Sequence, residues 1–169
     1  MQGAVSQEME VNVPASRAWE VYGTLLLSQL VGKDLTEKGL KAGFKNAEVL
    51  QGDGGVGTIL HAVFLPGNAC GFASFKEKFV TVDNEKRVKE TQMIEGGYLD
   101  LGFSLYRTRF EVREKSKDRC ITRITAEYEV KEADEDQIAA NNASTTKLLL
   151  VMLGAAKNFL VVDENTNGK

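Results

Sequence analysis

Hydrophobic periodicity divides the chain into a strand with short helices, a long β-rich middle and a carboxy-terminal helix. In VSQEMEVNV, residues 5–13, the apolar side chains share one parity, which predicts a half-buried strand. Pro14 interrupts this pattern, and SRAWEVYGTLLLSQLV then predicts one or two short helices with a break at Gly23. We expect the second helix over residues 25–31 and mostly loop over residues 32–44.

The middle of the chain, residues 45–131, has a β-like pattern throughout. Turn signals interrupt it at short and regular intervals, which leaves no room for crossover helices. The strands must therefore be mostly antiparallel and joined by hairpins. The turn signals are Gly52-Asp53-Gly54-Gly55, Pro66-Gly67-Asn68, Asp83-Asn84-Glu85, Gly96-Gly97 and Ser116-Lys117-Asp118.

The carboxy-terminal part predicts one long helix. Helix-forming residues without proline run from Ile138 to Val162, after acidic residues 134–136 that favour a helix start. Apolar residues cover a wide arc of this helix, so one face should lie across the sheet. The sequence thus predicts an α+β domain over residues 1–162, with a flexible tail over residues 163–169. A curved seven-stranded antiparallel sheet around the helix would leave an internal cavity.

Composition narrows the class of protein further. With 169 residues, 43% of them hydrophobic, the chain can enclose the core of a single domain. Its 21 Lys and Arg and 24 Asp and Glu residues are scattered and give a net charge of −3, so we expect no nucleic-acid partner. The amino terminus lacks a signal-like pattern, and the apolar run 148–156 is shorter than the about 20 residues of a membrane helix. We expect a cytoplasmic protein without a membrane span, as a monomer or weak dimer.

Cysteine and histidine are too few for several common sites. Cys70 and Cys120 are the only cysteines, and we expect no structural disulfide in a reducing compartment. His61 is the only histidine, and its parity is opposite to that of its apolar neighbours, which predicts an exposed side chain without a catalytic role. We therefore expect neither a multi-histidine metal site nor a metal cofactor.

The stretch QGDGGVGTIL has glycines at the spacing of a dinucleotide-binding fingerprint, at Gly52, Gly54 and Gly57. Such a loop must lead directly into a helix, whose amino terminus holds the pyrophosphate. Here a strand-like TILHAVF follows, Asp53 places negative charge at the phosphate position, and Thr58 stands where a Walker loop needs lysine. We interpret the stretch as a hairpin loop whose glycines permit positive φ.

Three stretches together, GDGGVGTIL, FKEKFVTVDNEKR and QMIEGGYLDLG, resemble a known family. They are similar to the norcoclaurine-synthase-like branch of the plant pathogenesis-related class 10 proteins, which share the START-like birch-pollen allergen (Bet v 1-like) fold. The resemblance extends over residues 5–162. It implies a seven-stranded antiparallel sheet gripping the long helix around a large apolar cavity, with the glycine loop as a rigid hairpin tip near the cavity end.

The resemblance also implies a chemistry that needs no cofactor. Enzymes of this branch condense a phenolic arylethylamine such as dopamine with an aryl aldehyde, through an iminium ion and Pictet–Spengler ring closure. A related group, similar to norbelladine synthase, condenses tyramine with a benzaldehyde. The family positions for Tyr, Glu, Lys and Asp fall on Phe75, Glu77, Lys89 and Thr108. Two of the four are therefore substituted in this chain.

The strand pattern suggests how the two retained groups would act. Glu77 shares its parity with Phe79 and should face inward, and an odd-numbered turn would pair Lys89 with Phe79, diagonal to Glu77. Burial would lower the pKa of Lys89 and raise that of Glu77, while their mutual attraction opposes both shifts. Lys89 could then protonate a carbinolamine, with Glu77 as the base for the phenol or ring carbon. A structural ion pair that fills the cavity is the other interpretation.

A hydrophobic or aromatic small molecule is the expected partner of the cavity. Tyr98 and Asp100 are interpreted as hairpin geometry plus one phenol near the mouth, and Tyr106 can supply a hydroxyl. Residues 25–44 lack the Leu-Pro-rich segment usual around the entrance in this branch, which leaves the substrate open. The alternative function is non-catalytic binding of a hydrophobic ligand or hormone in plant defence. The expected ligand contacts are Phe75, Phe79, Leu60, Ala62, Phe64, Met93, Tyr106, Thr108, Leu148 and Met152.

Overall fold

The computed structural model describes residues 1–37, 44–68, 71–132 and 135–167. Within these residues the chain forms an antiparallel sheet, three α-helices and one short 3₁₀ helix. In chain order the elements are β1 (Gln2–Val11), α1 (Ala15–Tyr22), α2 (Leu26–Glu37), β2 (Phe44–Gln51), β3 (Ile59–Phe64), β4 (Ser74–Asp83), β5 (Val88–Gly96), η1 (Gly97–Leu101), β6 (Phe103–Ser116), β7 (Arg119–Val130) and α3 (Glu135–Asn167).

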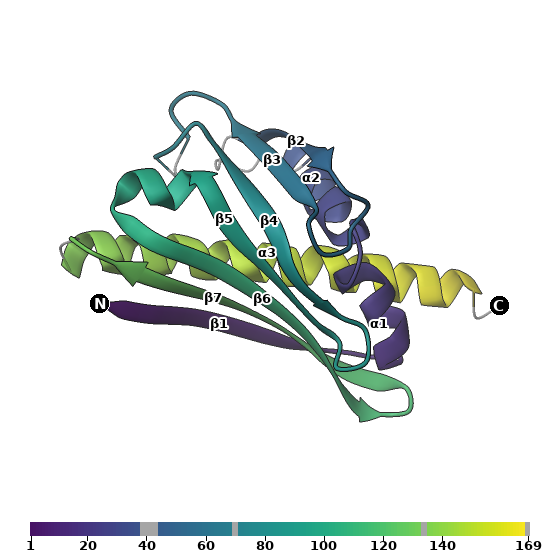
Figure 1. Ribbon diagram of the computed structural model, residues 1–169. Helices are drawn as coiled ribbons and strands as arrows, with labels where there is room; N and C mark the ends of the chain where they lie inside the picture. Colours follow the sequence, from purple (N-terminus) through teal and green to yellow (C-terminus); the bar gives the residue numbers. More distant parts are fainter. Residues whose placement is uncertain (38–43, 69–70, 133–134, 168–169) are drawn as a thin grey trace.

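The sheet has seven strands in the order β1-β7-β6-β5-β4-β3-β2, and every neighbouring pair is antiparallel. Consecutive strands from β2 to β7 are neighbours, as hairpin connections require. Figure 1 shows α3 lying along the curved sheet, with α1 and α2 grouped at one end. The predicted α+β class, with a seven-stranded sheet around a long helix, is confirmed.

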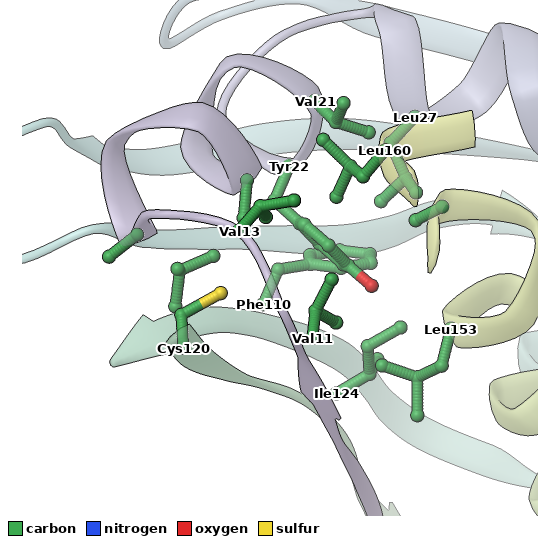
Figure 2. Close-up of a cluster of buried hydrophobic side chains, with 14 of the residues drawn as sticks. Val11, Val13, Val21, Tyr22, Leu27, Phe110, Cys120, Ile124, Leu153 and Leu160 are labelled. Atoms are coloured by element: carbon green, nitrogen blue, oxygen red, sulfur yellow. The ribbon is translucent and has the colours of Figure 1, made fainter. Parts of the chain in front are cut away.

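One end of the molecule is closed by a hydrophobic core that joins β1, α1, β6, β7 and α3. Tyr22 of α1 is fully buried there, and Figure 2 shows its ring reaching between Val11 and Phe110. Leu153 and Leu160 of α3 are also fully buried in this cluster. Burying a large apolar side chain is worth roughly 1.5–3 kcal/mol, so this cluster fixes α3 against the sheet.

Helix α3 is longer than the sequence predicted. It begins at Glu135, with Glu135 and Asp136 in its first turn, and continues to Asn167, past the expected end at Val162. The expected flexibility of residues 163–169 stays a prediction, although residues 163–167 are helical. By length and composition alone the helix could cross a membrane. In this fold it instead packs against β1, β7 and α2, as expected for the core helix of this class.

Helix α2 corrects a second boundary. Residues 32–37, expected to be loop, continue the helix to Glu37. Gly32 lowers helix propensity by about 1 kcal/mol, which the helix-forming residues around it and packing against α3 offset. Residues 38–43 of the expected loop lie outside the described residues, and Phe44, its last expected residue, begins β2.

The glycine loop joins β2 to β3 as a hairpin, which confirms its interpretation. Gly52, Gly54 and Gly57 have φ values of 89°, 107° and 94°, in the left-handed region that other residues avoid. The Thr58 hydroxyl accepts a hydrogen bond from the Gly54 amide at 2.8 Å and donates one to the Gly55 carbonyl at 2.7 Å. No helix follows, so the loop has no phosphate-binding amino terminus.

The turn between β4 and β5 changes the predicted register. It contains residues 84–87, an even number, and Val82 consequently pairs with Lys89. The predicted pairing of Lys89 with Phe79 is therefore wrong. Arg87 takes a φ of 54°, and the Asp83 carboxylate accepts hydrogen bonds from two backbone amides of this turn. These contacts stabilise the even-numbered turn.

A bulge at Val80 then restores the inward direction of the residues that precede it. Phe79 pairs with Thr91, and Val80 is the extra residue between two ladder positions. An extra residue shifts side-chain parity by one, so Phe79 and Lys89 share the inner face after all. Glu77 pairs with Met93, which makes Thr91 its diagonal neighbour and places Lys89 one step further away. The predicted diagonal contact between Glu77 and Lys89 is wrong.

Two smaller sequence expectations fall at the ends of strands. The expected turn at Gly96-Gly97 leads into the 3₁₀ helix η1 rather than directly into a strand.

Cys120 of β7 is a buried free thiol, and burial raises its pKa to about 11. Cys70 lies outside the described residues, so the expected absence of a disulfide stays a prediction.

Candidate active site

A cavity of about 460 Å³ lies between the inner face of the sheet and helices α2 and α3. Every residue proposed from the sequence as catalytic or ligand-binding lines this cavity. These residues are Leu60, Ala62, Phe64, Phe75, Glu77, Phe79, Lys89, Met93, Tyr106, Thr108, Leu148 and Met152. Their positions around one cavity follow from inward parity on β3 to β6 and from one side of α3. Their roles stay a prediction.

The wall also contains residues that the sequence reasoning did not select. An inward-facing residue of α2 or α3 can line a cavity or pack in an ordinary core, and both give the same helical periodicity. The sequence therefore does not distinguish the cavity-lining residues of these two helices. On β5 a signal existed, because Thr91 shares the parity of Lys89. The additional lining residues are Leu27, Ser28, Val31, Gly32, Ala47, Phe72, Thr91, Phe110, Ala126, Ser144, Thr145, Lys147, Leu149 and Val151.

Lys89 is the buried cation of the site, with 2% of its surface exposed. Its ammonium Nζ lies 4.8 Å from the ring centres of both Phe79 and Phe110, and it donates a hydrogen bond to the Thr24 carbonyl at 3.4 Å. Phe110 is its partner across β6, and Phe79 is close because of the bulge in β4. Burial lowers the pKa of Lys89 to about 8, and attraction to Glu77 opposes that shift.

Among the described residues that line the cavity, Glu77 of β4 is the only one with a carboxylate. Thr91 Oγ1 donates a hydrogen bond to its Oε2 at 3.2 Å. Burial raises the pKa of Glu77, while this hydrogen bond and the charge of Lys89 act in the opposite direction. The expected directions of both pKa shifts therefore agree with the structure.

Glu77 and Lys89 do not form a direct ion pair. Both residues are described, and no oxygen of Glu77 lies within 4.0 Å of Lys89 Nζ. Each nevertheless contributes to the pKa of the other. This separation disfavours the interpretation that the two charges only fill the cavity as a structural ion pair. A small polar group of a ligand could instead contact both side chains.

The two substituted family positions lie beside these groups. Phe75 precedes Glu77 by two residues on β4 and packs its ring 6.0 Å from the rings of Phe64 and Phe72. Thr108 of β6 pairs with Thr91 of β5. The cavity wall thus has a phenyl ring and a hydroxyl where the family pattern has a phenol and a carboxylate.

One end of the cavity is aromatic. Tyr98 of η1 stacks on Tyr106 of β6 with ring centres 4.4 Å apart. The hydroxyl of Tyr106 shares a hydrogen bond of 3.0 Å with Thr145 Oγ1 of α3. Burial raises the pKa of Tyr106, so this phenol stays protonated over the physiological range. Tyr98 is buried and lines the cavity, and Asp100 is exposed.

His61 points away from this chemistry. It pairs with Glu48 on β2 and Lys76 on β4, and its Nδ1 lies 3.6 Å from Glu48 Oε1. Its side chain is 26% exposed on the outer face of the sheet. Across the part of the chain that the structure describes, no group of three His, Cys, Asp or Glu side chains is placed to hold a metal ion.

Comparison with known proteins places this architecture in a family. The model of the pathogenesis-related protein Bet v 1 family matches residues 1–152. The chain belongs to the Bet v 1 family. The solved structure of Ara h 8.0201, at 12% identity and a TM-score of 0.70, has the same fold over 96% of this chain and 99% of that one.

Several plant enzymes are similar in sequence to this Bet v 1 family member. It is 41% identical to norbelladine synthase of Narcissus pseudonarcissus over 161 residues, which cover 95% of this chain and 93% of that protein. It is 43% identical to S-norcoclaurine synthase of Thalictrum flavum subsp. glaucum over 127 residues, which cover 75% of this chain and 57% of that protein. The chain thus spans little more than half the length of that norcoclaurine synthase.

Solved structures agree with these sequence relationships. A truncated norcoclaurine synthase from Thalictrum flavum matches with a TM-score of 0.78 and 37% identity, covering 95% of this chain and 94% of that one. The same enzyme in complex with dopamine and hydroxybenzaldehyde matches with a TM-score of 0.64 and 36% identity, covering 89% of this chain and 87% of that one. The sequence-based assignment to the norcoclaurine-synthase-like branch is confirmed.

Proposed function

We propose that this protein catalyses the condensation of a phenolic arylethylamine with an aryl aldehyde, followed by Pictet–Spengler ring closure. The observation that carries the proposal is the placement of a buried lysine and a single carboxylic acid on one wall of an apolar cavity. Similarity to norbelladine and norcoclaurine synthases supports an enzyme of this class. No step of this reaction requires electron transfer, so the chain's own side chains suffice.

Lys89 acts as the acid in the proposed reaction. Attack of the amine on the aldehyde gives a carbinolamine, whose hydroxyl must leave as water. A lysine with a pKa of about 8 is mostly protonated near pH 7 yet gives up its proton more readily than an exposed lysine. Proton transfer from Lys89 to that hydroxyl would therefore favour formation of the iminium ion.

Glu77 acts as the base for ring closure. The phenol activates the ring carbon that attacks the iminium carbon, and either the phenol or the ring carbon must lose a proton. Burial raises the pKa of Glu77, which strengthens the carboxylate as a base once it is ionised. The aromatic end of the cavity, with Tyr98 and Tyr106, offers rings against which an aryl substrate can pack.

The test is turnover of dopamine or tyramine with a panel of aryl aldehydes, followed by chiral analysis of the product. We expect an enantiomeric excess from the wild type and a loss of about 10²-fold or more in rate for Lys89→Met, the range for removing a general acid. Lys86→Met, in the exposed β4–β5 turn, is the matched control and should retain the wild-type rate. Racemic product at the uncatalysed rate would contradict the proposal.

A second candidate function is binding of a hydrophobic ligand without turnover. The specific observation in its favour is that Phe75 and Thr108 leave the site with neither the phenol nor the second carboxylate of the family pattern. In that case calorimetry would detect binding of the same aldehydes or amines, while the product would form only at the background rate.

A further inference from the structure

The nitrogen of Lys89 has an unusual set of neighbours for a buried lysine. Among the described residues, its hydrogen-bond acceptor is the neutral carbonyl of Thr24, and its aromatic contacts are the faces of Phe79 and Phe110. Among the described residues no carboxylate lies within ion-pairing distance of it. The charged form is therefore only partly compensated for its removal from water.

The neutral form of this amine has a free lone pair. A neutral primary amine carries two N–H groups and one lone pair, and the Thr24 carbonyl occupies only one N–H. With a pKa of about 8, roughly a tenth of Lys89 is neutral at pH 7 and about half at pH 8. Lysines desolvated in apolar pockets are the ones that form Schiff bases with carbonyl compounds.

We propose that Lys89 is also a nucleophile, which captures an aryl aldehyde in the cavity as a covalent Schiff base. The Lys89 nitrogen forms a bond to the carbonyl carbon while the carbonyl π bond breaks, and one amine proton moves to the oxygen. The carbinolamine hydroxyl then leaves as water after receiving the proton of Glu77. Lys89, aldehyde and neutral Glu77 thus become an iminium ion, a carboxylate and one water molecule.

The position of Glu77 suits this second proton transfer. Its hydrogen-bond partner Thr91 is two residues from Lys89 on the same face of β5, so the acid and the lysine line the same cavity. The product is a cationic iminium ion near a carboxylate, which stabilise each other in an apolar cavity. The capture uses the same cavity as the proposed condensation but does not require that an amine substrate ever react.

Borohydride trapping tests the inference directly. The wild-type protein is incubated with 4-hydroxybenzaldehyde, reduced with sodium borohydride, and analysed by intact mass and peptide mapping. We expect one principal adduct on Lys89, with a mass increase equal to the aldehyde plus two hydrogens minus one water. Its yield should rise with pH and level off slightly above pH 8, as the pKa of Lys89 requires.

Substitutions at Lys89 and Lys86 separate this inference from the proposed function. Lys89→Arg should remove the adduct, while Lys86→Arg should leave it unchanged. Adducts confined to Lys147 or to surface lysines in the wild-type peptide map would overturn the inference, whatever the folding of the variants. Capture on Lys89 without turnover of dopamine or tyramine would support the inference and contradict the proposed condensation. Turnover of dopamine or tyramine without capture on Lys89 would support the proposed condensation and contradict the inference.

Discussion

At the scale of single residues, the site depends on the contacts that stabilise two buried ionisable side chains, Lys89 and Glu77. Lys89 receives two aromatic faces and one carbonyl, and Glu77 receives the Thr91 hydroxyl. Because the two charged groups are not directly paired, each can change its protonation state without breaking an ion pair. Two unpaired ionisable groups in an apolar cavity favour proton transfer, but they stabilise the folded protein less than a direct ion pair or apolar side chains would.

Thr91 should control the acidity of Glu77. Its hydroxyl stabilises the carboxylate, so Thr91→Val should move the already raised pKa of Glu77 further upward, and Thr91→Ser should restore it. Carbon-detected NMR titration of labelled glutamate carboxyl groups measures the shift directly. If the protein is an enzyme, the limb of its pH–rate profile that reports the base should move in the same direction. A Glu77 titration identical in the valine and serine variants would contradict this role.

Lys89 should make the stability of the protein depend on pH. Its folded pKa of about 8 lies below the ordinary value of 10.5, so between these values the unfolded chain binds more protons and stability rises with pH. The cost of the buried charge is fully present below about pH 8. Relative to Lys89→Met, the wild type should therefore gain up to about 3 kcal/mol as pH rises from 8 to 10.5.

Urea unfolding of the wild type and Lys89→Met at several pH values measures this difference. Other groups, including the buried tyrosines, titrate in both proteins and cancel in the comparison. A difference in unfolding free energy that stays constant from pH 7 to pH 10.5 would show that Lys89 titrates as an ordinary exposed lysine.

At the scale of secondary-structure elements, local sequence patterns predicted most of the fold. Alternation in β1 and the turn signals of the middle region were sufficient for the antiparallel sheet, and the glycine loop was recognised because a strand follows it. The register of β4 and β5 was not predictable in the same way. The even-numbered turn moves Phe79 and Lys89 to opposite faces of the sheet, and the extra residue Val80 returns them to the same face. Neither the turn length nor the bulge has a distinct pattern in the sequence.

The boundaries of helices α2 and α3 show the same limitation. Residues 32–37 lack a clear period and include Gly32, yet packing against α3 stabilises the helix. Parity and family resemblance indicated the inward-facing positions on β3 to β6 that line the cavity, and the roles of these residues stay a prediction. The contacts of Lys89 with Thr24 and Phe110 were not predicted, because they join the α1–α2 connection and β6 to β5 over long distances in the sequence.

Two glycines of the β2–β3 loop can test whether the loop packs against Leu25. Gly54 and Gly57 both have positive φ, so alanine should cost about 1–2 kcal/mol at either position. A Cβ on Gly54 would also lie 3.3 Å from Leu25, whereas nothing lies within 4 Å of one on Gly57. Gly54→Ala should therefore be the more destabilising of the two in urea unfolding. Equal losses would show that the loop does not pack tightly against the junction of α1 and α2.

At the scale of the whole molecule, α3 has two functions that can be separated. Its part around Leu149 and Met152 lines the cavity, while Leu153 and Leu160, further along the same face of the helix, lie in the closed core, to which Leu149 also belongs. The sheet can stay open around a ligand because this core supplies stability elsewhere. The cavity lies beside this packed core, between the curved sheet and the helices that Figure 1 shows lying along it.

Leu153→Ala tests this separation. Leu153 is fully buried and does not line the cavity, so the substitution should lower the free energy of unfolding by about 2–5 kcal/mol, the usual cost of such a truncation. Leu150→Ala, at a position 44% exposed, is the matched control on the same helix and should change stability by less than about 1 kcal/mol. Well below the unfolding temperature, both variants should bind 4-hydroxybenzaldehyde in calorimetry as the wild type does. Loss of binding in Leu153→Ala, while the variant remains folded by circular dichroism, would show that core and cavity are one cooperative unit.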